Sequence, residues 1–495
     1  MSLSRLSTTR SISHLLLSGY NPLSPPTSSS LSLAPNQRQS PSNPSLAPAP
    51  FPAWLASVGR QHDGPSATLR SIAGGAAHNL LTYRNHKGVD RILALGTRNE
   101  AGQLGLGFAS QEGTRGLVEG FEGEEVLQVA AGVAASYLLV RTGQAESKDS
   151  TALYSFGNLS RGRLGQPSLF SRHHLEADEE PRMHILPRAT AIQLPQGAGR
   201  ITQIEAGFEH LLVLTEDGTI FGTGCNTDGQ LGLGGSSPSA LDDLHELTQL
   251  QLPSHLQTHE GGIRTIRAGA DTSALITESG KIWTWGNSEY AQALHGRTID
   301  QISAPLAIDL SFLPSPRRIA DFRCGGSFSF LLDDRGSVYS CGYGALGLGK
   351  DTLQSLKPRR IDKLEGEGVS RISAGWGYAA AVRDAGSSSA LWTWGLNSPH
   401  GRLGLGTLPP SPSSSSSPPF PSSSDRFSRS PSPQLNVPMH VYEPTRVELP
   451  MRELGLGEGG EGEGEWRIGE VETGEEGLWV VVQADDGIGG VAEVD

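Results

Sequence analysis

The chain has 495 residues, a formal net charge of -13, 63 glycines, 32 prolines and only 6% aromatic residues. An acidic body argues against a nucleic-acid-binding surface spread over the fold, so we expect no direct DNA binding. Cys225, Cys324 and Cys341 include no C-x-x-C pair, which argues against a disulfide framework or a zinc site. No apolar run reaches the roughly 18 residues of a membrane span, and the glycine content predicts many tight turns and short strands.

Residues 1–52 differ in kind from the rest and are predicted to be a mitochondrial transit peptide or a disordered tail. The first 60 residues hold four arginines and many serines, but no lysine, aspartate or glutamate. An acid-free, arginine- and serine-rich segment is typical of transit peptides. The apolar residues that could share one helical face are Leu3, Leu6, Ile12, Leu15 and Leu16. The Ser/Pro-rich composition of residues 22–50 also fits a disordered tail, and this alternative stays open.

One unit then recurs along the chain, and three copies align closely: AGFEHLLVLTEDGTIFGTGCNTDGQLGLG from Ala206, AGADTSALITESGKIWTWGNSEYAQALHG from Ala268, and CGGSFSFLLDDRGSVYSCGYGALGLG from Cys324. In each copy a first glycine is followed 11 residues later by a second and 6 residues after that by a third. These glycines are Gly207, Gly218 and Gly224; Gly269, Gly280 and Gly286; and Gly325, Gly336 and Gly342. Further copies cover residues 73–107, 131–166 and 374–406, which makes six.

Strand and turn geometry explains why glycine recurs at these spacings in each repeat. LLVLT and TIFGTG, for example, are predicted to be paired strands, and the short loop EDG between them ends in a glycine that can adopt positive φ. The GQLGLG tail turns the chain sharply away from the sheet, while its leucines anchor the turn in the core. We therefore expect the glycines to be structural.

The two ends of the chain are predicted to form a seventh unit together. Residues 467–482 resemble the first half of a unit, and residues 53–64 resemble the second half. Radial repetition of four-stranded blades protects sheet edges, so we predict an all-β, seven-bladed propeller over residues 53–482, its last blade closed by strands from both termini.

Four insertions interrupt the predicted array, at residues 167–199, 235–262, 407–438 and 455–465, and an acidic tail spans residues 483–495. The segment LDDLHELTQLQL in the second insertion could form a short helix. The Ser/Pro-rich third insertion is predicted to be disordered, and the Gly/Glu-rich fourth to be mobile.

No catalytic, cofactor or metal site is predicted. The glycine loops match neither G-x-x-x-x-G-K-[ST] nor G-x-G-x-x-G. His78 and His210 share one repeat position, but only two of six copies have histidine there, so we expect them to brace the blades by hydrogen bonding. The His- and acid-rich stretch at residues 172–184 lacks zinc spacing and is interpreted as a solvated loop. No nucleophile–base or paired-carboxylate pattern is evident.

The aGxxH…dGxvyxwGxNxxGQLGlG unit resembles the repeat of the regulator of chromosome condensation (RCC1) family, and the transit-like N-terminus is similar to its mitochondrial branch. The resemblance implies a seven-bladed propeller that acts as an interaction or assembly scaffold in mitochondria, in the matrix or peripheral to the inner membrane. Implied partners are a dynamin-related or small GTPase, mitoribosome factors or respiratory-complex assembly factors. The alternative is a nuclear or cytosolic exchange factor for a Ran-like GTPase.

The resemblance also implies candidate partner-binding residues. In the nuclear member of the family, acidic residues near the start of the repeats contribute to the face that engages a small GTPase. The matching positions here are Glu209 and Asp271. A carboxylate at such a position can pair the lysine of a GTPase phosphate loop once nucleotide and Mg²⁺ loosen, which stabilises the nucleotide-free state. Guanine-nucleotide exchange on a partner is the only activity implied.

Overall fold

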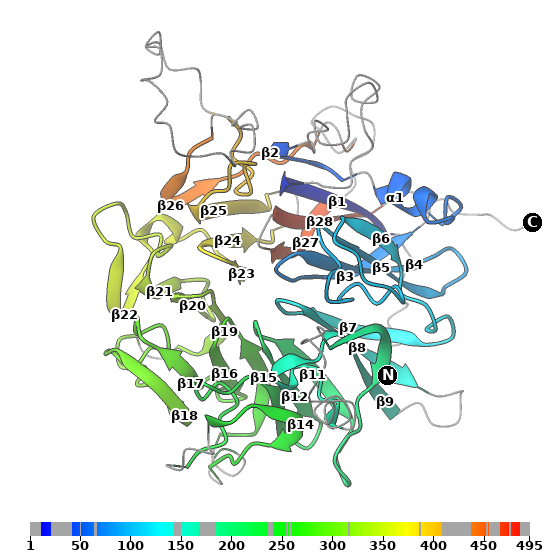
Figure 1. The fold of residues 1–495 in the computed structure, drawn as a ribbon. Coiled ribbons are helices and arrows are strands. Elements are labelled where there is room, and N and C mark those ends of the chain that lie inside the picture. The colour runs from blue at the N-terminus through cyan, green and yellow to red at the C-terminus, as the bar shows by residue number, and fades with distance from the viewer. Residues whose placement is uncertain are drawn as a thin grey trace, which may run out of the picture.

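The computed structural model shows a closed ring of seven four-stranded antiparallel sheets around a central axis (Figure 1), which confirms the predicted propeller. It describes residues 11–20, 42–49, 51–63, 67–142, 150–167, 184–235, 241–253, 256, 260–314, 317–385, 388–407, 437–451, 454, 466–474 and 477–485. Among these residues, no helix combines the length and apolar character needed to cross a bilayer.

The first six blades follow one another in chain order. The first contains β3 (Thr68–Gly74), β4 (His78–Arg84), β5 (Asp90–Gly96) and β6 (Thr114–Leu117); the second contains β7 (Glu125–Ala131), β8 (Ala135–Thr142), β9 (Ser150–Asn158) and β10 (Ile185–Ala191). The third contains β11 (Ile201–Ala206), β12 (His210–Thr215), β13 (Ile220–Gly224) and β14 (Leu244–Gln249); the fourth contains β15 (Ile263–Ala268), β16 (Thr272–Thr277), β17 (Ile282–Ser288) and β18 (Ile299–Ala307). The fifth contains β19 (Ile319–Cys324), β20 (Phe328–Asp333), β21 (Val338–Tyr343) and β22 (Gln354–Arg360); the sixth contains β23 (Arg371–Ala374), β24 (Tyr378–Arg383), β25 (Ala390–Leu396) and β26 (His440–Arg446). The short helices are α1 (Phe51–Ser57), η3 (Ser160–Gly162) and η5 (Asp362–Leu364).

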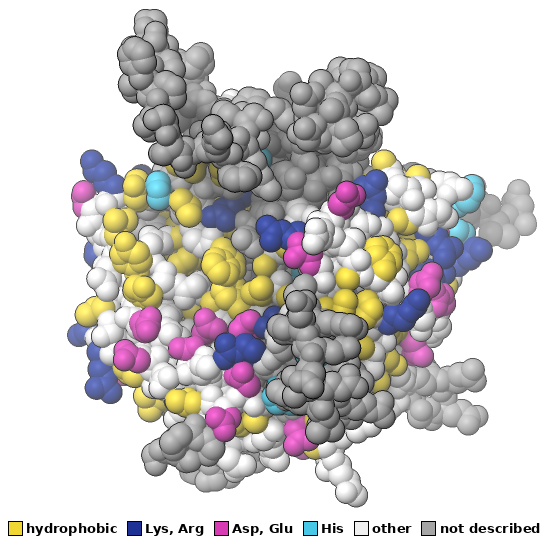
Figure 2. Space-filling model, viewed as in Figure 1, with side chains coloured by type: hydrophobic (Ala, Val, Ile, Leu, Met, Phe, Trp, Pro, Cys, Tyr) yellow, Lys and Arg dark blue, Asp and Glu magenta, His cyan; other side chains and the backbone are white. Residues whose placement is uncertain are grey.

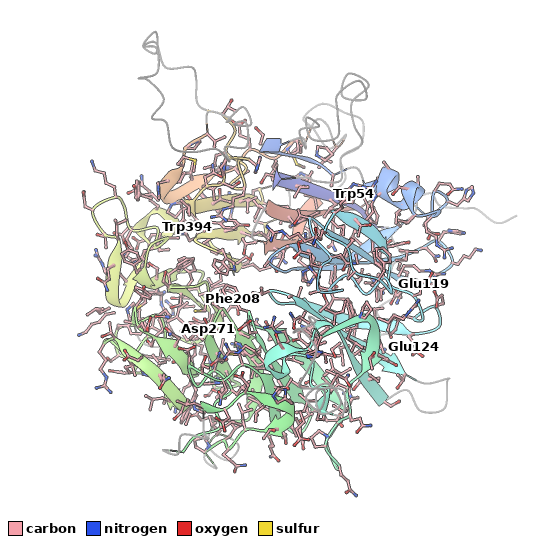
Figure 3. All side chains as sticks on the ribbon, in the orientation of Figure 1. Trp54, Glu119, Glu124, Phe208, Asp271 and Trp394 are labelled. Atoms are coloured by element: carbon pink, nitrogen blue, oxygen red, sulfur yellow. The ribbon has the colours of Figure 1, made fainter. Side chains whose placement is uncertain are left out.

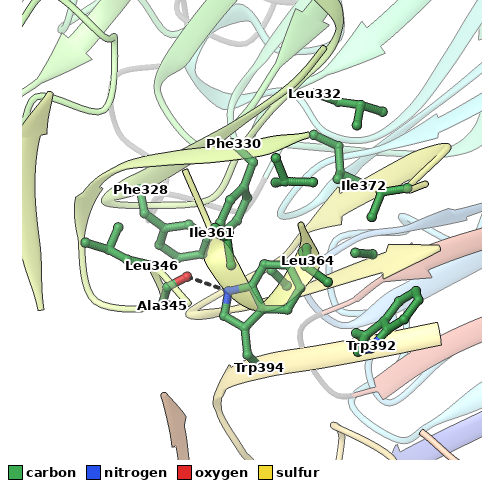
Figure 4. Packing of buried hydrophobic residues seen from close by; sticks show 14 of the residues in the cluster. Phe328, Phe330, Leu332, Ala345, Leu346, Ile361, Leu364, Ile372, Trp392 and Trp394 are labelled. Carbon is green, nitrogen blue, oxygen red and sulfur yellow. Dashed lines mark hydrogen bonds between the residues drawn. The ribbon is translucent and has the colours of Figure 1, made fainter. Parts of the chain in front are cut away.

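The core consists of seven apolar clusters among the described residues, one between each pair of neighbouring blades. Alternate side chains of a strand point to opposite faces of its sheet, so a central strand supplies two clusters at once. In β12, Leu211 packs toward the second blade and Leu212 toward the fourth. Between the fifth and sixth blades, buried Trp394 packs edge-on against Phe330, and its Nε1 donates a hydrogen bond to the carbonyl of Ala345 at 2.9 Å (Figure 4).

Two predicted insertions contain the outer strands of their blades. The short helix suggested within residues 235–262 is wrong, because Leu244–Gln249 forms β14 and its alternation turns Leu247 into the core. Likewise β10 lies within residues 167–199. Residues 408–436 and 455–465 lie outside the described residues. Of the predicted acidic tail, residues 483–485 continue a strand and the rest is outside the described part.

The last blade, called the closing blade below, combines strands from both ends of the chain, as predicted (Figure 1). Its order is β2 (Ser42–Pro48), β1 (Ser11–Tyr20), β28 (Gly477–Asp485) and β27 (Trp466–Thr473). β1 pairs with β28 over nine residue pairs, from Ser11 opposite Asp485 to Gly19 opposite Gly477. The two N-terminal strands therefore lie within residues 1–52, the segment predicted to be a transit peptide or disordered.

The prediction that residues 53–64 supply the N-terminal strand of this blade is wrong. Phe51–Ser57 forms α1, whose fully buried Trp54 packs 6.1 Å from Trp479 of the closing blade. The strand comes instead from the run of leucines in β1. Leu15 and Leu17 pack toward the first blade, while Leu16 packs toward the sixth. A strand buried on both faces needs consecutive apolar residues, which also fit one face of a helix.

Candidate functional site

One end of the propeller, called the loop face below, carries the loop with the first glycine of each repeat. The turn after the third strand lies at the same end, because His210 at the start of β12 pairs with Gly224 at the end of β13. Figures 2 and 3 view this face, and Figure 3 labels Phe208 and Asp271 near its centre. The loop face therefore presents two segments of each repeat to a partner.

The first glycines allow the backbones of neighbouring blades to approach closely. A Cβ on Gly207 would lie 2.6 Å from the carbonyl oxygen of Gly269 and 2.1 Å from Cε1 of His210. Gly269 and Gly325 are similarly crowded by Cys324 and by Phe328 and Gly375, respectively. Backbone hydrogen bonds then link successive loops, such as Phe208 N to Ala270 O at 3.1 Å. At these positions close approach is what requires glycine.

The second and third glycines meet a different requirement. Gly218 has φ of +80° in an open hairpin turn, and Gly280 and Gly336 have the same conformation. Gly224 combines φ of +110° with the carbonyl oxygen of Glu209 2.4 Å from a Cβ built on it, and Gly286 and Gly342 repeat this combination. Positive φ makes both positions favour glycine. Close contact adds to this at all three third glycines and at Gly280 and Gly336, but not at Gly218.

His210 bridges two blades through a buried relay. Its Nε2 lies 2.9 Å from Ser273 Oγ, which donates to the carbonyl of Gln230 at 2.8 Å. Because the serine hydrogen is used on that carbonyl, the network requires the neutral Nε2–H tautomer. Burial lowers the pKa of His210 to about 3 and that of His78 to about 4, so both rings are neutral at physiological pH. The first two blades repeat the relay with His78, Ser136 and Gln103.

A cavity of about 510 Å³ runs between the inner strands and is lined by charged side chains. Arg267 lies between two carboxylates, 3.0 Å from Glu205 and 2.7 Å from Asp321. Arg323 also pairs with Asp321, at 3.1 Å. This lining was not predicted from the sequence. In most repeats, polar side chains occupy the positions two and four residues before the first glycine, and this sequence pattern marks the cavity lining.

No group of His, Cys, Asp and Glu that could hold a metal ion occurs among the described residues. Residues 172–183 of the predicted solvated loop lie outside them.

The structure brings Glu209 and Asp271 together on the loop face but gives them different environments. Glu209 forms an ion pair with buried Arg163, and Arg161 lies 3.7 Å away. Asp271 is largely desolvated and faces the carboxylates of Asp228 and Glu209, which raises its pKa to about 6. Above that pH, Asp271 is a carboxylate in an environment that favours an incoming cation.

Aromatic residues accompany these carboxylates: Tyr290, Tyr343 and Trp376 are exposed, and Phe208 is half-buried. Phe208 and Trp376, from blades on opposite sides of the ring, stack at the mouth of the cavity with centroids 4.4 Å apart and an interplanar angle of 11°. Tyr290 and Tyr343 form a second stack at 5.7 Å. Figure 2 shows hydrophobic side chains at the centre of this face and over the blades beside it. We call Phe208, Tyr290, Tyr343 and Trp376 the aromatic patch.

The aromatic patch was not predicted from the sequence either, although one sequence pattern points to it. The residue after the first glycine is Ala76, Val133, Ala270 or Gly326 in four copies, and Phe208 or Trp376 in the other two. Trp376 is 45% exposed, and large exposed apolar groups of this kind are enriched at protein interfaces.

Profiles described as "Regulator of chromosome condensation (RCC1) repeat" match residues 217–276 and 335–382, and a second profile of the same description matches residues 201–230 and 263–292. A mouse relative, "RCC1-like G exchanging factor-like protein", is 28% identical over 365 residues, covering 69% of this chain and 70% of the relative. The Arabidopsis thaliana "RCC1 domain-containing protein RUG3, mitochondrial" is 27% identical over 361 residues, covering 72% and 71%. The crystal structure of human WBSCR16 superimposes with a TM-score of 0.65 at 22% identity, covering 96% of this chain and 99% of that one. The matching profiles identify RCC1 repeats in this chain, and the structure arranges its repeats as a seven-bladed ring.

Proposed function

We propose that this protein is a mitochondrial interaction scaffold whose loop face engages a GTPase, either small or dynamin-related, and accelerates its nucleotide exchange. The observation that carries the proposal is the aromatic patch lying beside the desolvated carboxylate of Asp271. A surface with aromatic anchors and a poised anion is suited to binding another protein. The mouse relative's name, with its reference to G exchange, supports the same assignment.

In this mechanism the propeller acts on the GTPase and does not bind the nucleotide itself. The aromatic patch supplies buried area, while Asp271 can accept the phosphate-loop lysine of the GTPase as nucleotide and Mg²⁺ leave. The propeller thereby binds the nucleotide-free state more tightly than the nucleotide-bound state, and this difference in affinity drives release. Asp271 is better suited to this role than Glu209, because Arg163 already neutralises Glu209.

Exchange is tested by release of fluorescent GDP from candidate mitochondrial GTPases. The wild-type chain should accelerate release from one of them, and Asp271→Lys and Trp376→Ala should each lower that acceleration by about tenfold or more, the size expected of a hot-spot residue. Leu306→Ala is the matched control, since Leu306 is 45% exposed but lies on the outer strand β18. Glu209→Lys should act less specifically, because it also breaks the ion pair with Arg163.

Equal rates for wild type and Asp271→Lys would remove Asp271 from the mechanism. No acceleration by the wild-type chain with any GTPase tested would leave the scaffold role alone, with mitoribosome or respiratory-complex assembly factors as its proposed partners.

The mitochondrial location rests on the acid-free N-terminus and on the relative named as mitochondrial. A fluorescent tag after residue 495 leaves the N-terminus free. Mitochondrial fluorescence is the expected result. A nuclear or cytosolic signal would favour the alternative, an exchange factor for a Ran-like GTPase in those compartments.

A further inference from the structure

Glutamine side chains clamp neighbouring inner strands together at two blade junctions. Gln128, four residues before the first glycine of its repeat, donates from Nε2 to the carbonyl of Ile204 at 2.7 Å and accepts from the amide of Ile204 at 2.9 Å. Gln203 makes the same two bonds with Ile266, both at 3.0 Å. An amide side chain can do this because it carries both a donor and an acceptor.

The junction where the ring closes has a glutamate at the equivalent position. Glu470 of β27 accepts a hydrogen bond at Oε2 from the amide of Ile72 at 3.1 Å, and Ile72 occupies the same repeat position as Ile204. Two residues later, Glu472 accepts from the amide of Gly74 at 3.1 Å. A carboxylate has no hydrogen to donate, so an ionised Glu470 makes only the amide half of the clamp.

The surroundings of Glu470 favour its protonated form. Desolvation and the neighbouring Glu472 raise the pKa of Glu470 to about 8, although the hydrogen bond from the Ile72 amide, Arg323 and Arg371 oppose this shift. Desolvation also raises the pKa of Glu472 to about 7; the hydrogen bond from the Gly74 amide and Arg323 oppose the shift, and Glu205 adds to it. Other polar groups of this junction line the same cavity, namely Arg70 of β3, Ser373 of β23, Thr473 of β27 and Gln483 of β28. Tyr378 of β24 donates to the carbonyls of Gly474 and Gly477, and Asp384 pairs with Arg371 at 3.2 Å.

We propose that the junction between the closing blade and the first blade is a proton-operated latch. Protonated Glu470 donates its hydrogen to the carbonyl of Ile72 and completes the clamp that Gln128 and Gln203 make elsewhere. Loss of that proton removes one hydrogen bond and leaves two facing carboxylates at the junction where the two chain termini close the ring. The latch is a property of the ring and is independent of the proposed exchange activity.

The direction of the pH effect follows from proton linkage. The folded chain holds protons on Glu470 and Glu472 that the unfolded chain releases near pH 4.5. The contribution of these two groups to the free energy of unfolding is therefore greatest at or below pH 4.5, and it falls as the pH rises from 4.5 to 8. The unusual sign distinguishes these groups from carboxylates in ion pairs, whose contribution to stability falls as the pH decreases.

The test compares thermal unfolding of the full chain at pH 6 and pH 9. Glu470→Gln supplies a permanent donor, so the difference between its Tm and that of wild type should be larger at pH 9 than at pH 6, by about 2–4 °C. Gln128→Glu is the reciprocal control and should lower Tm more at pH 9 than at pH 6. Equal pH dependence of wild type and Glu470→Gln would overturn the proposal.

Hydrogen exchange of the wild-type chain provides a second test that needs no variant. After correction for intrinsic rates, protection of residues 68–74 should fall between pH 6 and pH 9 by more than protection of residues 201–206, which Gln128 holds. Unchanged protection of residues 68–74 would also overturn the proposal.

Discussion

A chain lacking residues 1–52 is expected to lose its cooperative thermal transition, or to unfold at least about 10 °C below the full-length chain. The deletion removes β1 and β2 and leaves β28 with an unpaired edge. It also removes Leu15, Leu16 and Leu17, which are 5%, 0% and 1% exposed. Burial of each leucine contributes about 1.5–3 kcal/mol, before the lost strand pairing is counted.

Circular dichroism melts and size-exclusion chromatography measure this loss. Deletion of residues 1–10 is the matched control, because it leaves both strands intact and should unfold within about 2 °C of the full-length chain. A cooperative chain without residues 1–52 at the full-length Tm would show that the N-terminal strands do not hold the ring closed.

The same strands restrict how a targeting segment can be processed. Cleavage near residue 52 would separate β1 and β2 from the ring, whereas cleavage before Ser11 would retain both. We therefore expect the mature chain isolated from mitochondria to begin at or before Ser11, as measured by N-terminal peptide mass spectrometry. A mature N-terminus after Pro48 would contradict the role of these strands in the working protein.

Gly207→Ala is expected to lower the free energy of unfolding by roughly 3 kcal/mol, because overpacking adds to the loss of a buried hydrogen bond. The new methyl group would lie 2.1 Å from Cε1 of His210 and 2.6 Å from the backbone oxygen of Gly269. Moving the imidazole to relieve this contact would break its hydrogen bond to Ser273.

Gly218→Ala in the same repeat shows how much of the loss in unfolding free energy comes from backbone conformation and how much from steric crowding. Gly218 has φ of +80°, and a Cβ at this position would have no neighbouring atom within 4 Å, so only left-handed strain of about 1–2 kcal/mol is expected. Urea unfolding of both variants gives the comparison. Equal losses would mean that the first glycines serve conformation rather than the close approach of blades.

The repeat and the ring could be predicted from the sequence, but segments with an ambiguous local pattern were placed incorrectly. The consecutive leucines of β1 fit a helical face as well as a strand buried on both sides, and only pairing with β28, more than 450 residues away, distinguishes the two. The helix suggested before residue 262 failed for a related reason: LHELTQ has weak local preference, and the free edge of β13 makes it a strand.

The candidate site was harder to predict than the fold, because it is formed by contacts between residues distant in sequence. Position in the repeat marked Glu209 and Asp271 equally, yet Arg163 from the preceding blade pairs with Glu209 while Asp271 faces other carboxylates. Phe208 and Trp376 stack although 168 residues separate them. No local pattern can reveal such pairs, because they arise only when the ring closes.

The sequence by itself determined the number of repeats, the glycine positions and the all-β architecture, since these follow from short-range periodicity and turn geometry. Only the tertiary structure decided which N-terminal strands close the ring, which carboxylate is neutralised and where the protons of Glu470 and Glu472 are held. The physical reason is that strand pairing, ion pairing and desolvation depend on neighbours from other blades, and the folded ring alone specifies those neighbours.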